Sequence, residues 1–249
     1  MIQKRVVVIT GGASGIGRET AQKFAQKGDQ VVIADIDIAL GEETVHWIQD
    51  SGGEAIFIPT DVKQMNEVTF LIEKTIETFG RIDILFNNAG ISHLSSLLEL
   101  DIDAYQRVIE INQHGVAHGI IAAGKAMKRL GTKGLIINMA SVLGIVASPG
   151  NFAYHASKSA VMMMTKSAAL ELADDGIRVI AVAPGPVDTP ILQEYQHIKD
   201  EKILRAIRGE TILTEPSKIA DMVYVLSLPE ASVLNGSVVM LDEGYTAFK

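Results

Sequence analysis

Tyr154 and Lys158 stand four residues apart in a stretch that favours a helix, so their side chains share one helix face. A phenol with a pKa near 10 is almost fully protonated at neutral pH and is a poor base unless its anion is stabilised. An ammonium within about 4 to 6 Å lowers such a pKa by roughly 1 to 3 units. The pair is therefore predicted to act as a general acid and base, which carbonyl reduction and alcohol oxidation both require.

Ser141 stands thirteen residues before Tyr154, after a predicted strand at 135–140. At the carboxyl end of a strand its hydroxyl would point into the crevice where open α/β sheets bind ligands, and it would hold the substrate oxygen there. A tyrosine and a lysine at this spacing are, by themselves, more often a partly exposed pair on a helix. Ser141 and a nucleotide-binding turn favour catalysis instead.

That turn lies at residues 10–17, TGGASGIG, between the first predicted strand and the first predicted helix. Its expected cofactor contacts are Gly11, Ser14, Gly15, Ile16 and Gly17. Glycines let the backbone approach a pyrophosphate closely, and the helix N-terminus supplies free N–H groups. The spacing is T-G-x-x-x-G-x-G and not G-x-G-x-x-G, and a turn that only reverses the chain is the alternative. Its place between a strand and a helix favours dinucleotide binding.

Asp35 ends the second predicted strand, 18 positions beyond Gly17. A carboxylate there can accept hydrogen bonds from the adenosine ribose hydroxyls and would repel a 2′-phosphate. No lysine or arginine stands at positions 13, 14, 36 or 37 to offset that repulsion. NAD(H) is therefore predicted in preference to NADP(H), and a solvated aspartate at a strand end is the alternative.

Short β-branched runs alternate with amphipathic helical segments along the whole chain. The predicted strands are 5–9, 30–35, 55–60, 82–86, 135–140, 177–183 and 238–241, and the predicted helices include 16–27, 64–79 and 104–129. This order predicts an α/β fold: a single-domain, Rossmann-type, doubly wound sheet of seven mainly parallel strands with helices on both faces. The domain is expected to cover residues 1–249, with a lid over the substrate at about 185–216.

Composition excludes several classes of protein. The net charge is −8 with no basic cluster, so neither nucleic acid nor an anionic membrane is an expected partner. The chain has no cysteine and no apolar run long enough to span a bilayer, and its N-terminus lacks an export signal, so a cytoplasmic location is predicted. His114 and His118 have helical spacing but no third ligand, so no metal site is expected.

These motifs together resemble the short-chain dehydrogenase/reductase family in its compact single-domain form. The resemblance is carried by the turn at 10–17, Asp61-Val62, the Asn87-Asn88-Ala89-Gly90 run, Asn112, Ser141, the Tyr-x-x-x-Lys pair and the segment 184–189. It implies that Asp61 and Val62 hold the adenine, and that Asn88, Ala89 and Gly90 pack beside the adenosine ribose; a mainly structural role for Asn88, bracing the central sheet, is the alternative. It also implies cofactor contacts at Pro184, Gly185, Val187, Thr189, Tyr154 and Lys158.

The same resemblance implies that Asn112 holds a water linking Lys158 to solvent; a buried asparagine that satisfies backbone groups is the alternative. It further implies a homotetramer. Two residues depart from the family pattern, Glu243 in place of a glycine and His155 after the tyrosine. The expected substrate pocket comprises His93, Ser141, Leu143, Asn151, Tyr154, Ile191 and Leu192.

The predicted activity is NAD(H)-dependent interconversion of a small secondary alcohol and a ketone. Three alternatives stay open. An NADPH-type 3-oxoacyl carrier-protein reductase is disfavoured by Asp35 and by the acidic balance of the chain. A nucleotide-sugar epimerase or dehydratase resembles T-G-x-x-G-x-x-G, and Ser14 occupies the middle glycine. A non-catalytic NAD(H)-binding sensor or scaffold would keep the fold without the chemistry.

Overall fold

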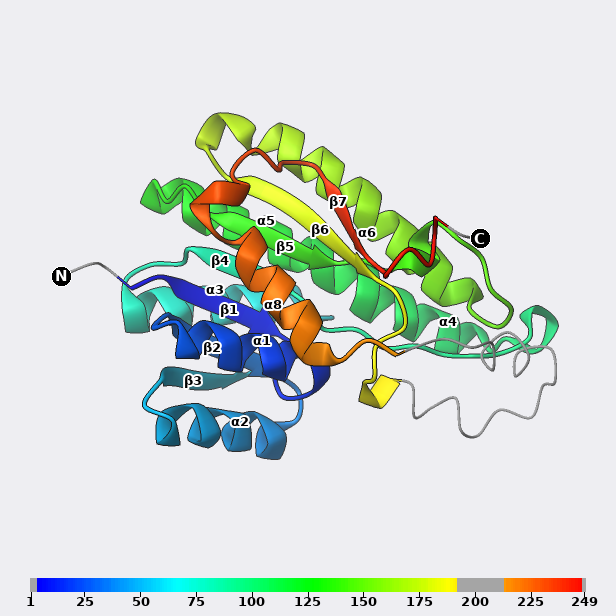
Figure 1. Cartoon of the computed structure of the whole chain (residues 1–249), viewed down its shortest axis with the longest axis horizontal. Coiled ribbons are helices and arrows are strands. Elements are labelled where there is room, and N and C mark those ends of the chain that lie inside the picture. The colour runs from blue at the N-terminus through cyan, green and yellow to red at the C-terminus, as the bar shows by residue number, and fades with distance from the viewer. Residues whose placement is uncertain (1–3, 192–212, 248–249) are drawn as a thin grey trace.

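A computed structural model of the chain describes residues 4–191 and 213–247, and within them a seven-stranded sheet has the order β3-β2-β1-β4-β5-β6-β7 (Figure 1). Every neighbouring pair of strands is parallel. The strands are β1 Val6–Thr10, β2 Gln30–Asp35, β3 Glu54–Pro59, β4 Ile84–Asn87, β5 Leu135–Met139, β6 Arg178–Pro184 and β7 Val238–Leu241. The predicted α/β fold class is confirmed.

The central strands are apolar on both sides because helices cover both faces of the sheet. All five residues of β1 are buried, and Val7 pairs in register with Val31 of β2 and Ile84 of β4. Parallel strands between two helix layers favour such uninterrupted β-branched runs. β7 lies at the edge and is only half-buried.

Two helix layers enclose the sheet. The helices are α1 Gly15–Gln26, α2 Ile38–Asp50, α3 Met65–Phe79, α4 Ile102–Ile109, α5 Gly115–Leu130, α6 Phe152–Glu171 and α8 Pro216–Leu226, with short helical turns η1 Leu97–Glu99, η2 Glu110–His114, η3 Val142–Gly144, η4 Ala173–Asp175 and η6 Pro229–Ala231. One core contains apolar residues of α1, α2 and α8, and the other contains those of α3, α5 and α6. Figure 1 shows α1 and α8 crossing the front of the sheet.

The helix predicted at 104–129 is interrupted in the structure. It consists of α4, one π-helical turn at Glu110–His114 and then α5. Such a turn inserts an extra residue into the helical repeat, so apolar periodicity alone does not reveal it. The turn carries Asn112, whose side chain is fully buried.

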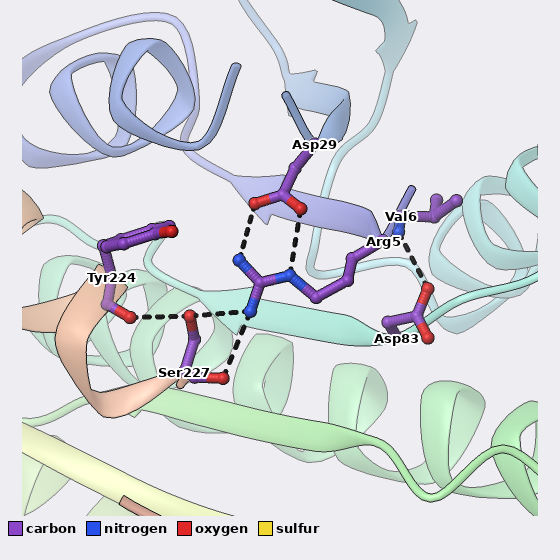
Figure 2. Close-up of polar contacts among 6 residues, drawn as sticks. All are labelled: Arg5, Val6, Asp29, Asp83, Tyr224 and Ser227. Carbon is purple, nitrogen blue, oxygen red and sulfur yellow. Dashed lines mark hydrogen bonds and ion pairs between the residues drawn. The ribbon is translucent and has the colours of Figure 1, made fainter. Parts of the chain in front are cut away.

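The amino ends of the strands are held together by Arg5 (Figure 2). Its guanidinium donates to both carboxylate oxygens of Asp29, at 2.9 and 2.6 Å, and to the carbonyl and hydroxyl oxygens of Ser227, each at 3.2 Å. It also lies 5.6 Å from the ring centres of Phe24 and Tyr224. Arg5 therefore joins the start of β1 to the start of β2 and to the end of α8, at the end of the sheet opposite the nucleotide-binding turn.

Most of the expected lid lies outside the described residues, as does Leu192. The described ends of that segment are paired: Asp188 donates its N–H to the carbonyl of Thr214 at 3.0 Å, and Thr214 donates its N–H to the carbonyl of Pro186 at 2.9 Å. None of the helices in the described ranges has the length and apolar character that crossing a membrane requires.

Candidate active site

A cavity of about 910 Å³ opens at the carboxyl ends of the strands, and its walls come from segments far apart in the chain. Its lining includes the turn after β1, the ends of β2 and β4, Ser141 after β5, the start of α6 and the segment after β6. The volume is at the upper end for small-molecule sites, as an extended dinucleotide with a small substrate would require. Parallel strands bring these segments together because their carboxyl ends all meet at one edge of the sheet.

The backbone of the glycine-rich turn packs so tightly on its neighbours that Gly11 and Gly17 have no room for a side chain. Gly11 has φ +64°, and a Cβ there would lie 2.8 Å from the Cα of Ala89. A Cβ on Gly17 would lie 2.0 Å from the carbonyl oxygen of Gly11. Asn88 fixes the turn from the side, because its Nδ2 donates to the carbonyls of Thr10 and Gly11, each at 3.0 Å. These two bonds hold the backbone of the turn against the end of β4.

Ser14 precedes α1, and its side chain makes no hydrogen bond to the first turn of that helix. The backbone N–H groups of the first helical turn are therefore not capped by Ser14 and can donate hydrogen bonds to a bound anion. Gly11, Ser14, Gly15 and Ile16 line the cavity, whereas Gly17 is buried beneath it. Both the close backbone and the uncapped helix end fit a bound pyrophosphate.

Asp35 lines the cavity beside the turn. One carboxylate oxygen accepts from the N–H of Ala13 at 3.1 Å, and the other accepts from the N–H of Asp37 at 3.1 Å. Asp35 therefore supports the turn and still has lone pairs for ribose hydroxyls. Among the described lining residues the lysines are Lys63 and Lys158, and Lys63 lies 3.5 Å from a carboxylate oxygen of Asp61. Lys63 is a nearby cation that the sequence analysis missed.

Asp61 and Val62 also line the cavity, and α5 fixes their position. His118 shares a hydrogen bond of 2.9 Å between its Nδ1 and the carbonyl oxygen of Val62, which requires the proton on Nδ1. Gly115 lets the helix approach, because a Cβ there would lie 2.8 Å from a methyl group of Val62. Within the described ranges no three histidine, aspartate or glutamate side chains gather to hold a metal ion.

The side chains with catalytic potential meet where β5 and α6 converge. Ser141 follows β5, and its Oγ accepts from the N–H of Leu143 at 3.2 Å. Tyr154 lies in the first turn of α6 and Lys158 one turn later, with Nζ 5.5 Å from the centre of the tyrosine ring. All three line the cavity. The helical spacing of Tyr154 and Lys158 thus places a cation against the phenol ring.

Lys158 is only 2% exposed, and its Nζ donates to the carbonyl oxygen of Met139 at 2.7 Å. Burial disfavours the charged form and lowers the pKa of Lys158 from 10.5 to about 8. The group is still mostly an ammonium at pH 7. A Cβ on Gly90 would lie 3.6 Å from this Nζ and 3.2 Å from Oδ1 of Asn112. The lack of a side chain at Gly90 therefore leaves a small space that both polar groups border.

Asn112 braces the segment that follows β4. Its Oδ1 accepts from the N–H of Ile91 at 2.8 Å, and its Nδ2 donates to the carbonyl of Ile91 at 2.9 Å and to Oγ of Ser157 at 3.2 Å. Asn112 does not itself line the cavity, but Ile91 does. The side chain therefore satisfies buried backbone groups, which was one of its two expected roles.

The remaining cofactor candidates after β4 and β6 are at the cavity, namely Asn88, Ala89, Gly90, Pro184, Gly185, Val187 and Thr189. Of the expected substrate residues, Leu143, Asn151 and Ile191 line it as well. His93 does not, because the chain leaves the cavity after Ile91. Ser148, Pro149, Leu213 and Tyr245 line it without having been predicted; the position of Tyr245 depends on how the chain continues after β7, which no local pattern signals.

The short chain dehydrogenase family model matches residues 5–200. A cis-4-hydroxycyclohexanecarboxylate dehydrogenase of Sinomonas cyclohexanicum is 38% identical over 246 residues, covering 98% of this chain and 97% of that enzyme. A cyclopentanol dehydrogenase of Comamonas sp. is 36% identical over 249 residues, covering 99% and 98%. The solved structure of levodione reductase has a TM-score of 0.92 at 32% identity and covers 98% of both chains.

The chain therefore belongs to the short-chain dehydrogenase family, and the resemblance stated from its motifs is confirmed. Membership makes the protein an oxidoreductase of the alcohol and ketone class. The identity extends over almost the whole of each relative, so the fold, the turn after β1 and the Ser141, Tyr154 and Lys158 positions all lie within the matched region.

Proposed function

We propose that this protein oxidises a small secondary alcohol to a ketone, reversibly, with NAD+ as the hydride acceptor. The observation that carries the proposal is the cluster of Ser141, Tyr154 and Lys158 at one cavity wall, with the Lys158 Nζ 5.5 Å from the Tyr154 ring centre. The glycine-rich turn at the other end of the same cavity supports a dinucleotide. The nicotinamide ring, when bound, accepts the hydride from the alcohol carbon.

The chain's own residues handle the oxygen and its proton. The hydroxyl of Ser141 holds the substrate oxygen; in oxidation the deprotonated oxygen of Tyr154 takes the proton of the alcohol, and in reduction the hydroxyl of Tyr154 returns it. The ammonium of Lys158 favours the tyrosine anion because opposite charges attract strongly in a buried site. Asn112 keeps the Ile91 segment in place, and the family resemblance adds a water at Asn112 that passes the proton onward to solvent.

Cofactor choice follows from Asp35. Its carboxylate lines the cavity at the end of β2, where the adenosine ribose would lie, and its lone pairs can accept from both ribose hydroxyls. A 2′-phosphate would face this negative charge. Lys63 offers only partial compensation because it is paired with Asp61.

The substrate side of the cavity favours a cyclic or aliphatic alcohol. Its described walls include the apolar side chains of Val142, Leu143, Pro149, Ile191 and Leu213. Two relatives are named for cyclopentanol and for a hydroxycyclohexane carboxylate, and both names describe a secondary alcohol on a saturated ring. A homotetramer is proposed from the family resemblance.

A panel of cyclic and open-chain secondary alcohols, each assayed with NAD+ and NADP+ by the absorbance of the reduced cofactor, tests the proposal. We expect turnover of ring alcohols with NAD+ and much less with NADP+. Tyr154→Phe should remove turnover while NADH still binds, because the ring that packs on Lys158 is kept and only the hydroxyl is lost. Cofactor binding without turnover of any alcohol would favour the sensor, and NADPH-dependent reduction of 3-oxoacyl thioesters would favour the carrier-protein reductase.

A further inference from the structure

Residues 148–151, here called the 148–151 wall, form one side of the cavity between η3 and α6. Ser148, Pro149 and Asn151 line the cavity close to Ser141 and Tyr154. The wall belongs to no helix or strand, so its position depends on individual hydrogen bonds. Its anchoring therefore bears directly on how a substrate is held.

Hydrogen bonds to neighbouring segments and within the wall itself hold it in place. The N–H of Ser148 donates to Nε2 of His155 at 3.2 Å. Nδ2 of Asn151 donates to Oγ of Ser148 at 2.9 Å and to the carbonyl of Pro149 at 3.3 Å. The carbonyl of Gly150 accepts from the N–H of Ser95 at 3.1 Å. Only the first of these contacts depends on a side chain that titrates near neutral pH.

We propose that His155 is a positioning residue for the substrate: in its neutral form it holds the 148–151 wall through the Ser148 N–H, and protonation releases the wall. The proposal rests on the proposed function, since it assigns the wall to the substrate. His155 is also one of the two positions at which the chain departs from the family pattern. Its ring does not line the cavity, so it acts through Ser148 and not on the reacting atoms.

The direction of the effect follows from the donor and acceptor roles. A backbone N–H can only donate, so Nε2 of His155 must carry a lone pair and the ring must be neutral. A protonated imidazole has an N–H at both nitrogens and would place a donor against a donor. Ser148 would then lose its anchor, and Asn151 would lose the position of the hydroxyl to which it donates.

Burial lowers the pKa of His155 below its ordinary value of 6.5, which keeps the ring neutral at physiological pH. The segment 142–151 that packs on the ring contains no ionisable side chain. On α6 the neighbouring groups are Tyr154 and Lys158. The pKa of Lys158, about 8, lies above the range in which His155 titrates, so the two transitions are separable.

Two other elements pack against this part of α6. α4 meets it through Tyr105, whose ring centre lies 6.2 Å from that of Phe152, and η2 meets it through the bond from Asn112 to Ser157. The charged residues on α4 are Asp103 and Arg107, both exposed, and the ionisable residues on η2 are Glu110 and His114. His114, and His93 in the segment that Ser95 joins to the wall, are therefore the other histidines that an acid titration must take into account.

The experiment compares the KM for a ring alcohol, the KM for NAD+ and kcat between about pH 7.5 and about pH 5.5. Four proteins are compared: the native chain, His155→Gln, His155→Met and His114→Gln. Glutamine reaches about as far as Nε2 and offers an oxygen that accepts but does not titrate. Methionine has a similar length, and its thioether sulfur is only a weak acceptor. His114→Gln is the control for the histidine on η2.

For the native chain we expect the alcohol KM to rise about 5-fold on acidification, as loss of one hydrogen bond at a binding wall would produce, with kcat and the KM for NAD+ changing much less. His155→Gln should keep the native alcohol KM at both pH values. His155→Met should show the raised KM at both, and His114→Gln should behave as the native chain. The proposal is overturned if the acid rise survives in His155→Gln, or if His155→Met has the native KM at neutral pH.

Amide hydrogen exchange at Ser148 provides a readout that needs no substrate. We expect protection of this amide at neutral pH in the native chain and its loss in His155→Met, after correction for the intrinsic exchange rate. Equal protection in both proteins would refute the anchoring role of His155. Absence of turnover with any alcohol would instead count against the proposed function and would leave this exchange result to decide the proposal about His155.

Discussion

The ammonium of Lys158 donates to the carbonyl oxygen of Met139 at 2.7 Å, which ties the second turn of α6 to the end of β5. One bond thus links the strand that delivers Ser141 to the helix that delivers Tyr154. The same contact buries a cation in the core of the protein. The site keeps a charge that favours catalysis at a cost to the stability of the fold.

The cost at Lys158 predicts a pH-dependent stability. Below pH 8 the lysine is charged in both the folded and the unfolded chain, so the full free-energy cost of burying the charge lowers the stability of the fold. Between pH 8 and 10.5 the folded protein has released the proton that the unfolded chain keeps, so this cost shrinks and the unfolding free energy increases as the pH rises. The difference between the pKa values of Lys158 in the unfolded and folded chain corresponds to about 3 kcal/mol.

We therefore expect the native chain to gain about 3 kcal/mol in unfolding free energy relative to Lys158→Met as the pH rises from 7 to about 10.5. Urea denaturation of both proteins across this range measures the difference. General alkaline effects cancel between the two. A difference that stays constant with pH would show that the burial of Lys158 carries no such cost.

Asp35→Asn should weaken the discrimination between the two cofactors. The variant keeps an oxygen that can accept from the N–H of Ala13 and removes the negative charge that a 2′-phosphate would meet. We expect the ratio of kcat/KM for NAD+ to that for NADP+ to fall about 10-fold or more, as removal of a close like charge allows. Asp37→Asn is the matched control, because Asp37 is an exposed cap of α2 outside the cavity lining. An unchanged ratio in Asp35→Asn would assign cofactor choice to other residues.

Arg5→Met should lower the unfolding free energy by about 2 kcal/mol, because it leaves the carboxylate of Asp29 buried without its cation. The side chain of Asp29 is 8% exposed, and that of Arg5 is 28% exposed, which reduces the effect below that of a fully buried pair. Affinity for NADH should not change, since the contact lies at the amino ends of the strands (Figure 2).

The exposed pair Arg129 and Glu73 provides the comparison for Arg5 and Asp29. Its two side chains are 56% and 49% exposed, so Arg129→Met should change the unfolding free energy far less than Arg5→Met does. Chemical denaturation measures both variants. Equal losses in the two would mean that burial of Asp29 is not what makes its contact with Arg5 stabilising.

Asn112→Ala should lower the unfolding free energy by about 2 kcal/mol, because the N–H and the carbonyl of Ile91 lose their partner. Asn138→Ala is the matched control: Asn138 is equally buried but bonds to Asn87 and Thr165, which lie outside the cavity lining. We expect only Asn112→Ala to raise the KM for NAD+, since Ile91 lines the cavity. A fall in kcat with an unchanged KM would instead favour the proton relay at Asn112.

Much of the fold could be predicted from local patterns. Runs such as 5–9 and 30–35 are β-branched and bounded by turn residues, and they form β1 and β2 within a residue of the predicted bounds. The fourth strand is shifted, predicted at 82–86 and found at Ile84–Asn87, because Ile82 is buried before the ladder begins. The π-helical turn at Glu110–His114 was missed because one inserted residue barely alters the apolar pattern.

The sequence by itself determined the succession of strands and helices along the chain, the glycine-rich turn, and the spacing that puts Tyr154 and Lys158 on one helix face. These features depend on neighbours within a few residues. Only the tertiary structure decided which distant groups meet: Lys158 with the carbonyl of Met139, and Arg5 with Ser227, 222 residues away. Even the hydrogen bond between His155 and Ser148, which are only seven residues apart in the sequence, depends on how the 148–151 wall leads into α6. Hydrogen bonds of this kind have no periodicity in the chain, since they form only when packed elements bring a donor and an acceptor within about 3 Å.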